Sequence, residues 1–204
     1  MEQELAERGD LGRAQARLTL ASTSPQRRAI LEQLRIPFEV VAPAYVEDDP
    51  PGASGLELVR MHAEGKARSA HAARAVTLGV DTAVVLDGRA YGKPADREEA
   101  GRMLDDLASR THLVVSGLCL LGDGLEVVED ETTSVTFRAV SPELRATYLE
   151  SGEWEGRAGA YAIQGLGGRL VERIEGDYLN VVGLPGALLV SLLERHAPKL
   201  LEKP

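Results

Sequence analysis

Residues 17–31 read "RLTLASTSPQRRAIL", and this stretch contains a strand, a turn and a helix start in that order. The first part, "RLTLAS", has the apolar alternation of a strand. Ser24 can cap a helix through its hydroxyl, and Pro25 suits the first helical position because no N–H donor is needed there. The apolar stripe of the expected helix consists of Ile30, Leu31 and Leu34. The stretch therefore predicts one strand–helix unit of an α/β fold.

Strand and helix patterns keep alternating along the rest of the chain. We expect strands at residues 38–43, at 77–86 before an Asp-Gly turn, at 169–174, and as a pair joined by a glycine-rich turn over 111–137. We expect helices from Ser54 to about Ala75, Asp96 to about Leu107, Ser141 to near Gly152, and about Pro185 to His196. Ser54 and Glu57 have the spacing of a capping box. These patterns predict an α/β protein with a mixed sheet.

The composition is that of an ordinary globular protein. The chain has 204 residues, 44% hydrophobic and 27% charged, which is enough to bury a core in one domain or in two lobes around a cleft. No apolar run approaches the roughly 18 residues of a membrane span. Residues 1–16 are polar, so we expect a loose N-terminal tail, a single domain over residues 17–204, and a cytoplasmic protein.

The net charge of −9 and the single cysteine narrow the range of partners. A duplex-binding protein usually has a basic stripe, and none is visible, so we expect neither a nucleic-acid nor a membrane partner. Cys119 has no second cysteine to pair with, which agrees with a reducing compartment. Its apolar neighbours predict a buried, inert thiol. Any polyanion must therefore be held by a small local set of cations.

The helix that starts after Ser24 is a candidate anion site. Its first N–H groups have no partner within the helix, and the helix dipole is positive at this end. Arg27 lies four residues before Leu31, so we expect its guanidinium on the buried side, where it can bind an anion through two N–H groups. Arg28 points elsewhere. The alternative is that both arginines are solvated on a surface helix.

Two ionisable residues interrupt apolar patterns. Lys66 falls on a stripe of small apolar residues, so it either extends its ammonium to solvent or meets an anion. Asp81 lies inside the apolar strand "LGVDTAVVL", where a carboxylate is unfavourable unless it is paired, protonated or bound to metal. Both are candidates for a site. By themselves, Lys93 in "YGKP" and Glu47 in "EDDPP" are typical of an exposed lysine and a solvated acidic loop.

Glycines surround Tyr161 and Gln164 in "AGAYAIQGLGG", which indicates backbone packed close to another group. The Gln164 amide can donate and accept, so it suits reading the edge of a nucleobase. The alternative is a set of tight turns in a compact fold. Other chemistry has little support, because the four histidines lack metal spacing and neither a GxSxG nor a GxxxxGK[ST] motif is present.

Seven features in one order together resemble the Maf family of nucleotide pyrophosphatases. They are "LASTSPQRR", Glu47, "EGKARS", "GVDTAVVLDG", "YGKPAD", "RAGAYAIQGLGG" and "NVVGLP". The resemblance implies a two-lobed α/β fold with a central cleft, similar to that of inosine-triphosphate pyrophosphatases. It also implies hydrolysis of nucleoside triphosphates to monophosphate and pyrophosphate with a divalent metal cation, Mg²⁺ or Mn²⁺.

The functional positions of the family fall on particular residues of this chain. The aspartate of the DT motif, taken as the catalytic base, is Asp81. As a hypothesis, Asp81 and Glu47 hold the metal. Residues expected to bind the substrate phosphates are Ser24, Arg27, Lys66 and Lys93. Residues tied to the choice of base are Gln26, Thr82 and Gln164.

The DT and IQG motifs resemble the branch that acts on dTTP and UTP. Gln26 departs from the pattern, because this branch usually has arginine there and the 7-methyl-GTP branch has a bulky aromatic residue. Hydrolysis of 7-methyl-GTP or modified nucleotides therefore stays open, as does a nucleotide-binding regulator of cell division with little catalysis. His62 replaces a usual leucine, which we expect to affect only packing. A monomer and a homodimer are both open.

Overall fold

The computed structural model describes residues 17–202, so the loose tail predicted for residues 1–16 lies outside the described residues. Its strands are β1 (Leu18–Leu20), β2 (Phe38–Val40), β3 (Val76–Leu86), β4 (Arg89–Tyr91), β5 (Thr111–Gly122), β6 (Leu125–Phe137) and β7 (Val171–Glu175). Its helices are α1 (Pro25–Gln33), α2 (Gly55–Ala70), α3 (Arg97–Leu107), α4 (Pro142–Ser151), α5 (Tyr178–Val182) and α6 (Gly186–His196). Short 3₁₀ turns occupy Ala158–Ala160, Leu166–Arg169 and Pro198–Leu200.

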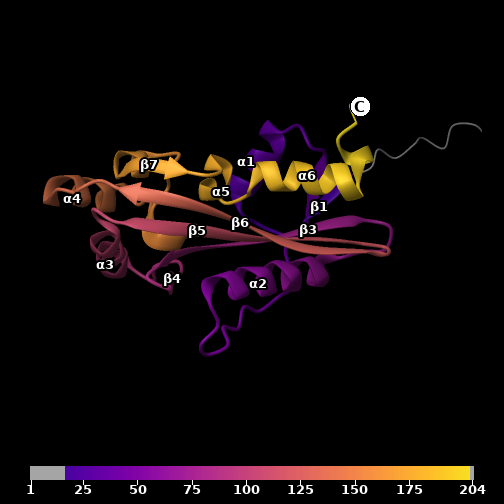
Figure 1. Cartoon of the computed structure of the whole chain (residues 1–204), viewed down its shortest axis with the longest axis horizontal. Helices are drawn as coiled ribbons and strands as arrows, with labels where there is room; N and C mark the ends of the chain where they lie inside the picture. Colours follow the sequence, from indigo (N-terminus) through magenta and orange to yellow (C-terminus); the bar gives the residue numbers. More distant parts are fainter. Residues whose placement is uncertain (1–16, 203–204) are drawn as a thin grey trace, which may run out of the picture.

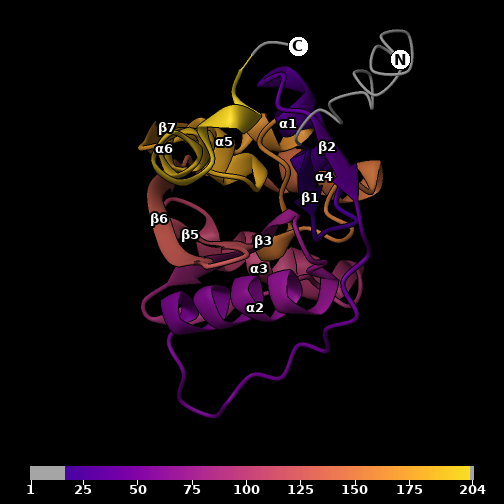
Figure 2. The same cartoon turned by 90° about the vertical axis from the view of Figure 1, so that its right-hand side faces the viewer.

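A seven-stranded sheet forms the middle layer, with the strand order β2-β1-β3-β5-β6-β7 and with β4 also paired to β3. The β1 strand is parallel to β2 and β3, whereas the other pairs are antiparallel. Helix α2 covers one face of the sheet, and α1, α5 and α6 lie on the other (Figures 1 and 2). The predicted mixed α/β sheet is therefore confirmed. No helix within residues 17–202 is long and apolar enough to cross a membrane.

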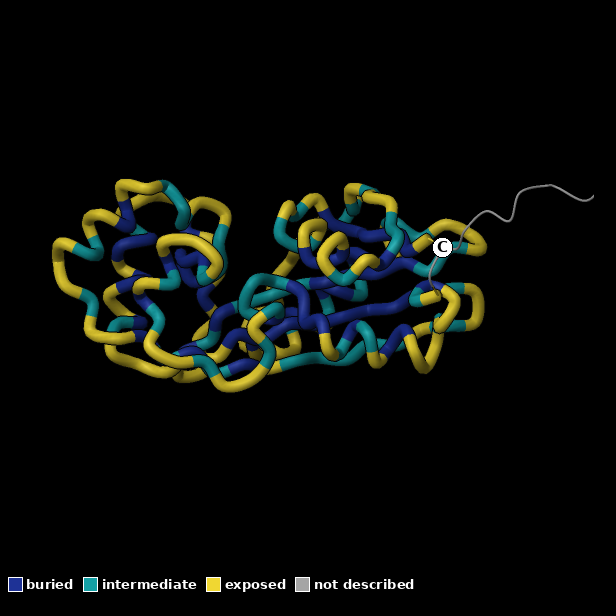
Figure 3. The backbone as a smooth tube through the Cα atoms, turned by 90° about the horizontal axis from the view of Figure 1, so that it is seen from above, coloured by how far each residue is buried: buried dark blue, intermediate teal, exposed yellow. Residues whose placement is uncertain are grey.

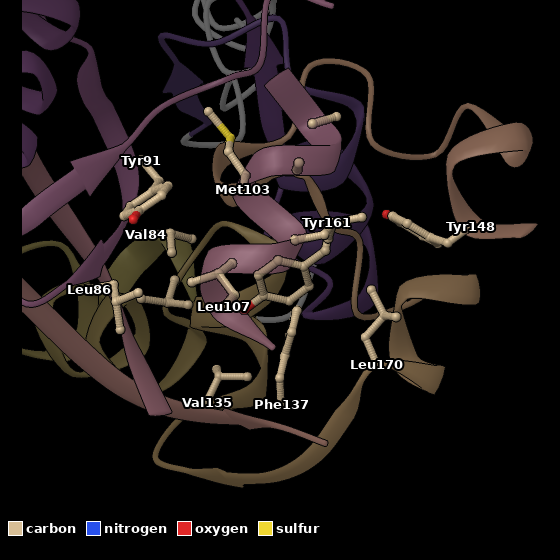
Figure 4. Close-up of a cluster of buried hydrophobic side chains, with 14 of the residues drawn as sticks. Val84, Leu86, Tyr91, Met103, Leu107, Val135, Phe137, Tyr148, Tyr161 and Leu170 are labelled. Atoms are coloured by element: carbon tan, nitrogen blue, oxygen red, sulfur yellow. The ribbon is translucent and has the colours of Figure 1, made fainter. Parts of the chain in front are cut away.

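Two large apolar clusters divide the molecule into two lobes, which are separate in the view of Figure 3. One cluster joins α1 and α6 to the sheet and includes Leu20, Leu78 and Leu189. The other, drawn in Figure 4, packs α3 and α4 around Phe137 and Tyr161. The long strands β3, β5 and β6 contribute to both clusters. The two-lobed α/β architecture expected from the resemblance is therefore confirmed.

Helix α2 packs close to the sheet because two strand glycines face it. A Cβ atom on Gly79 would lie 2.0 Å from the carbonyl oxygen of Ala63, and one on Gly117 would lie 2.3 Å from that of Val59. Neither strand position can hold a larger side chain unless the helix moves away. This close approach brings Lys66, also on α2, within reach of the sheet.

The central strand β3 is interrupted along one edge. On that edge β1 pairs with residues 76–78 and β4 pairs with residues 84–86, while β5 occupies the opposite edge. In the described part of the chain, no strand pairs with residues 79–83 on the first edge. Asp81 and Thr82 lie in this interruption, and the alternation of a strand sends their side chains to opposite faces.

Most helix starts and turns lie where local signals predict them. The hydroxyl of Ser24 caps α1, and Ser54 and Glu57 form the predicted capping box at the start of α2. Asp87 and Gly88 make the predicted turn after β3, both with positive φ. These features confirm that short side-chain and turn signals set the starts of α1 and α2 and the end of β3.

Helix α2 is shorter than predicted, since it ends at Ala70 and not near Ala75. His71 is already extended, and its Nδ1 lies 3.1 Å from Oγ1 of Thr77. Arg74 has a φ of 67°, in the left-handed region. The chain needs these residues to reverse direction into β3, so the helix stops before the run of alanines does. The short elements β4 and α5 were not predicted, because they are too short to show periodicity.

Candidate active site

A cavity of about 480 Å³ opens at the interruption of β3, which is within the usual size of a small-molecule site. Both lobes contribute to its wall. Predicted site residues that line it are Ser24, Gln26, Arg27, Glu47, Lys66, Thr82, Lys93 and Gln164. Asp81 is not part of the lining, and its carboxylate lies against the lining residue Lys66. The structure thus gathers the predicted residues around one cavity.

The guanidinium of Arg27 is held in place by a ring of oxygen acceptors. Its Nε donates to the carbonyl of Gly183 at 3.0 Å, and its Nη1 donates to the hydroxyl of Ser22 at 3.1 Å. Its Nη2 lies 3.4 Å from Oγ1 of Thr82. Burial lowers the pKa of Arg27, whereas the charges of Asp81 and Glu47 act to raise it. The side chain is therefore fixed as a cation in the cavity wall.

Two members of this ring, the hydroxyl of Ser22 and the carbonyl of Gly183, are not among the predicted site residues. Ser22 is buried and lies between β1 and the cap of α1, and its hydroxyl also accepts from the amide of Ser24 at 3.2 Å. Gly183 contributes only a backbone carbonyl, which a side-chain pattern cannot reveal. Its motif, "NVVGLP", belongs to the family resemblance but predicts no particular site residue. Thr82 joins the ring to the sheet through Ser116, 2.9 Å away.

Lys66 connects the two candidate carboxylates. Its Nζ lies 2.6 Å from Oε1 of Glu47 and 2.5 Å from Oδ1 of Asp81. Its side chain is only 11% exposed, so the ammonium meets anions within the cavity wall and does not extend freely to solvent. Of the two alternatives open from the sequence, the ion pair is the one observed. Asp81 is likewise paired, which is how a carboxylate is tolerated inside β3.

Several cations act on the carboxylate of Glu47. Partial burial alone would raise its pKa, but the hydrogen bond and charge of Lys66, with weaker effects of His62 and Lys93, lower the pKa below its ordinary value. The charge on Lys93 therefore reaches Glu47 across the cavity, although the side chain of Lys93 comes from the exposed loop after β4. Glu47 is kept ionised at neutral pH.

Part of the cavity lining is apolar. It includes Val84, Val114, Tyr161, Ala162, Val181 and Val182. Gln164 also lines the cavity and is exposed, so its amide can meet a bound group. Gln26 lies at the start of α1, where its Oε1 accepts from the hydroxyl of Ser24 at 3.2 Å. A flat apolar ring with polar edges fits such a lining.

The carboxylates of Glu47 and Asp81 both contact the ammonium of Lys66, so the two carboxylates lie close together. Mg²⁺ is commonly held by one or two carboxylates together with substrate phosphates, so this donor set suits a hard divalent cation. Within residues 17–202, no group of three or more His, Cys, Asp or Glu side chains is placed to hold a metal ion. Phosphate oxygens would have to complete the coordination.

The lining thus combines cationic and apolar side chains in one cavity, a combination that suits a polyanion carrying a flat ring. Residues 17–196 match the family described as Maf-like protein, and the chain belongs to this family.

Curated relatives match most of the chain. A dTTP/UTP pyrophosphatase of Gloeobacter violaceus is 45% identical over 179 residues, covering 87% of this chain and 94% of that protein. A dTTP/UTP pyrophosphatase of Symbiobacterium thermophilum is 46% identical, covering 86% and 92%. One of Thermococcus gammatolerans is 43% identical, covering 87% and 95%. Among solved structures, the Ham1 protein of Staphylococcus aureus aligns with a TM-score of 0.43 at 15% identity, over 59% of this chain and 71% of that one.

Proposed function

We propose that this protein hydrolyses nucleoside triphosphates, with dTTP and UTP as its substrates, to the nucleoside monophosphate and pyrophosphate. The observation that carries the proposal is that Arg27 and Lys66 line one cavity and that Asp81 contacts Lys66 there, although hydrophobic periodicity would place apolar residues at positions 66 and 81. The names of the curated relatives support the same reaction.

The cations of the cavity lining bind the triphosphate. Arg27, Lys66 and Lys93 bring positive charge to it, and the amides of the first turn of α1 add dipolar donors. Charge spreads over the phosphoryl oxygens in the transition state, so fixed cations stabilise that state more than the free substrate. The ring of acceptors around Arg27 matters because it removes the cost of orienting the guanidinium during the reaction.

Asp81 orients and deprotonates the attacking water. Lys66 donates to Oδ1 of this carboxylate, which leaves Oδ2 to take the proton. The water oxygen bonds to the α-phosphorus, and the bond from the α-phosphorus to the bridging oxygen of the β-phosphate breaks. Pyrophosphate leaves with the electron pair of that bond. A divalent cation such as Mg²⁺ or Mn²⁺, held by Glu47 and Asp81, would supply further positive charge to the phosphate oxygens.

The base packs against the apolar part of the lining, with side chains such as Val84 and Val182 on its ring. The amide of Gln164 reads the polar edge of a pyrimidine. Thr82 and Gln26 line the same cavity and contribute to the choice of base. The cytoplasmic location expected from the sequence, and the choice between a monomer and a homodimer, stay predictions.

A panel of triphosphates tests the proposal most broadly. The purified protein is incubated with dTTP, UTP, CTP, GTP, ATP and 7-methyl-GTP in the presence of Mg²⁺ or Mn²⁺, and pyrophosphate and monophosphate are measured together. We expect equal amounts of both products, with dTTP and UTP turned over fastest. Fastest turnover of 7-methyl-GTP would move the protein to the other branch. A nucleotide that binds tightly but survives overnight incubation would favour the regulator.

A further inference from the structure

The segment of residues 43–50, here called the strap, contacts α2 and carries Glu47. It contains no helix or strand, and its outward residue Val46 is 84% exposed. The side chain of Glu47 is itself 52% exposed. An exposed segment of this kind has little apolar burial to hold it, so its position depends on a few polar contacts.

Three strap residues contact two residues of α2. Tyr45 and Asp49 both contact His62, and Glu47, which lies between them in the sequence, contacts Lys66. His62 and Lys66 are four residues apart, so they are neighbours on the helix surface. The strap is therefore attached to α2 on both sides of Glu47.

His62 holds the strap on both sides of Glu47. Its Nδ1 lies 3.1 Å from the hydroxyl of Tyr45, and its Nε2 lies 2.8 Å from Oδ1 of Asp49. The imidazole is only 4% exposed. The ring of Tyr45 also lies directly on Gly65, where a Cβ would be 2.2 Å from Tyr45 Cε2. Our expectation that this histidine affects only packing is therefore wrong, because both ring nitrogens contact the strap.

We propose that His62 is a positioning residue, which fixes the strap so that the carboxylate of Glu47 stays at Lys66 and faces the cavity. The distance of 2.6 Å between Glu47 and Lys66 is then set by His62, which does not line the cavity, through its contacts with Tyr45 and Asp49. A leucine at position 62 would fill the same space but would leave both partners without a tether. The catalytic consequence of this proposal rests on the proposed function. The ordering of the strap by His62 does not depend on that function.

The structural part is tested by backbone ¹⁵N order parameters, which need neither substrate nor metal. In the wild-type protein we expect values near ~0.85 for the strap, as in α2, and in His62→Leu we expect the strap to fall below ~0.6 while α2 stays unchanged. His71→Leu is the matched control, because it removes a histidine hydrogen bond at the end of the same helix that does not reach the strap. Unchanged strap values in His62→Leu, or an equal drop in His71→Leu, would overturn the proposal.

The catalytic part is tested by the Mg²⁺ concentration that gives half-maximal turnover of dTTP. We expect an increase of about tenfold in His62→Leu, because Glu47 must then be ordered by the bound cation, and little change in His71→Leu. His62→Gln places its side-chain amide near the position of Nε2, and His62→Asn places its amide near the position of Nδ1. Each variant should therefore restore part of the wild-type Mg²⁺ dependence. Tyr45→Phe, a substitution in the strap, gives the same information if His62→Leu does not fold.

The two parts fail in different ways. A wild-type protein that hydrolyses no triphosphate would contradict the proposed function and leave the order parameters to decide the role of His62. A mobile strap in His62→Leu with unchanged Mg²⁺ dependence would refute the link from His62 to Glu47.

Discussion

Asp81 and Thr82 are consecutive residues of β3, yet their side chains meet different cations on opposite faces of the sheet. Oδ1 of Asp81 lies 2.5 Å from Nζ of Lys66, and Oγ1 of Thr82 lies 3.4 Å from Nη2 of Arg27. One cavity can use both faces because residues 79–83 have no strand partner on one edge in the described part of the chain. The interruption of the sheet is thus what brings the two cations together.

The guanidinium of Arg27 should not be replaceable by an ammonium. Arg27→Lys keeps the charge but cannot reach Gly183, Ser22 and Thr82 together, because lysine lacks the planar fork of donors. We expect kcat/KM for dTTP to fall by about 10²-fold, the scale for losing one preorganised charge. Arg28→Lys is the control, since Arg28 is adjacent and exposed, and should stay within twofold. Equal effects in the two variants would remove Arg27 from the phosphate site.

Gln164 should govern the choice of base more than the rate of the chemistry. Gln164→Ala removes an exposed amide from the cavity lining, so the preference for dTTP and UTP over CTP should fall toward equality. The measurement is the ratio of kcat/KM values across the nucleotide panel. Gln33→Ala, on the exposed end of α1, should keep the wild-type ranking. An unchanged ranking in Gln164→Ala would exclude this residue from base recognition.

Gly79 should be essential for the packing of α2. In Gly79→Ala the new methyl group would lie 2.0 Å from the backbone oxygen of Ala63, so helix and sheet must separate. We expect the free energy of unfolding, measured in urea, to fall by about 1–3 kcal/mol, the usual effect of overpacking. Gly122→Ala is the control, because its methyl group would meet its nearest neighbour at 3.5 Å. A wild-type stability for Gly79→Ala would mean that the helix does not rest on this strand.

Acid should destabilise the protein partly through His112. Burial lowers its pKa from the ordinary value of 6.5 to about 4, so the folded protein keeps the ring neutral while the unfolded chain takes a proton below pH 6.5. The stability is therefore lost as the pH falls from 6.5 toward 4, by up to about 1.4 kcal/mol per pH unit. His112→Gln, which can still bond to Tyr161, should show a shallower fall between pH 6.5 and 4.5 in urea titrations. His196→Gln, at an exposed position, should keep the wild-type slope.

Local chemistry explains what the sequence could predict. The caps at Ser24 and Ser54 and the turn at Asp87 depend on neighbouring residues, so a pattern can reveal them. A charge inside an apolar pattern needs a partner, so the pattern also indicates Lys66 and Asp81 as site residues. The positions of the Gly183 carbonyl and of the His62 contacts depend on the conformations of loops that are distant in the sequence. A periodic sequence pattern does not predict these conformations.

The most direct test of the account is the turnover of dTTP by Asp81→Asn, followed by pyrophosphate release. The control is Asp130→Asn, which changes another strand aspartate paired to a helix cation, 3.0 Å from Arg60. Arg60 does not line the cavity, whereas Lys66, the partner of Asp81, does. We predict a loss of at least ~100-fold for Asp81→Asn, the scale of one acid–base group, and a rate within twofold of wild type for Asp130→Asn. A folded Asp81→Asn protein that releases pyrophosphate at the wild-type rate would contradict the account.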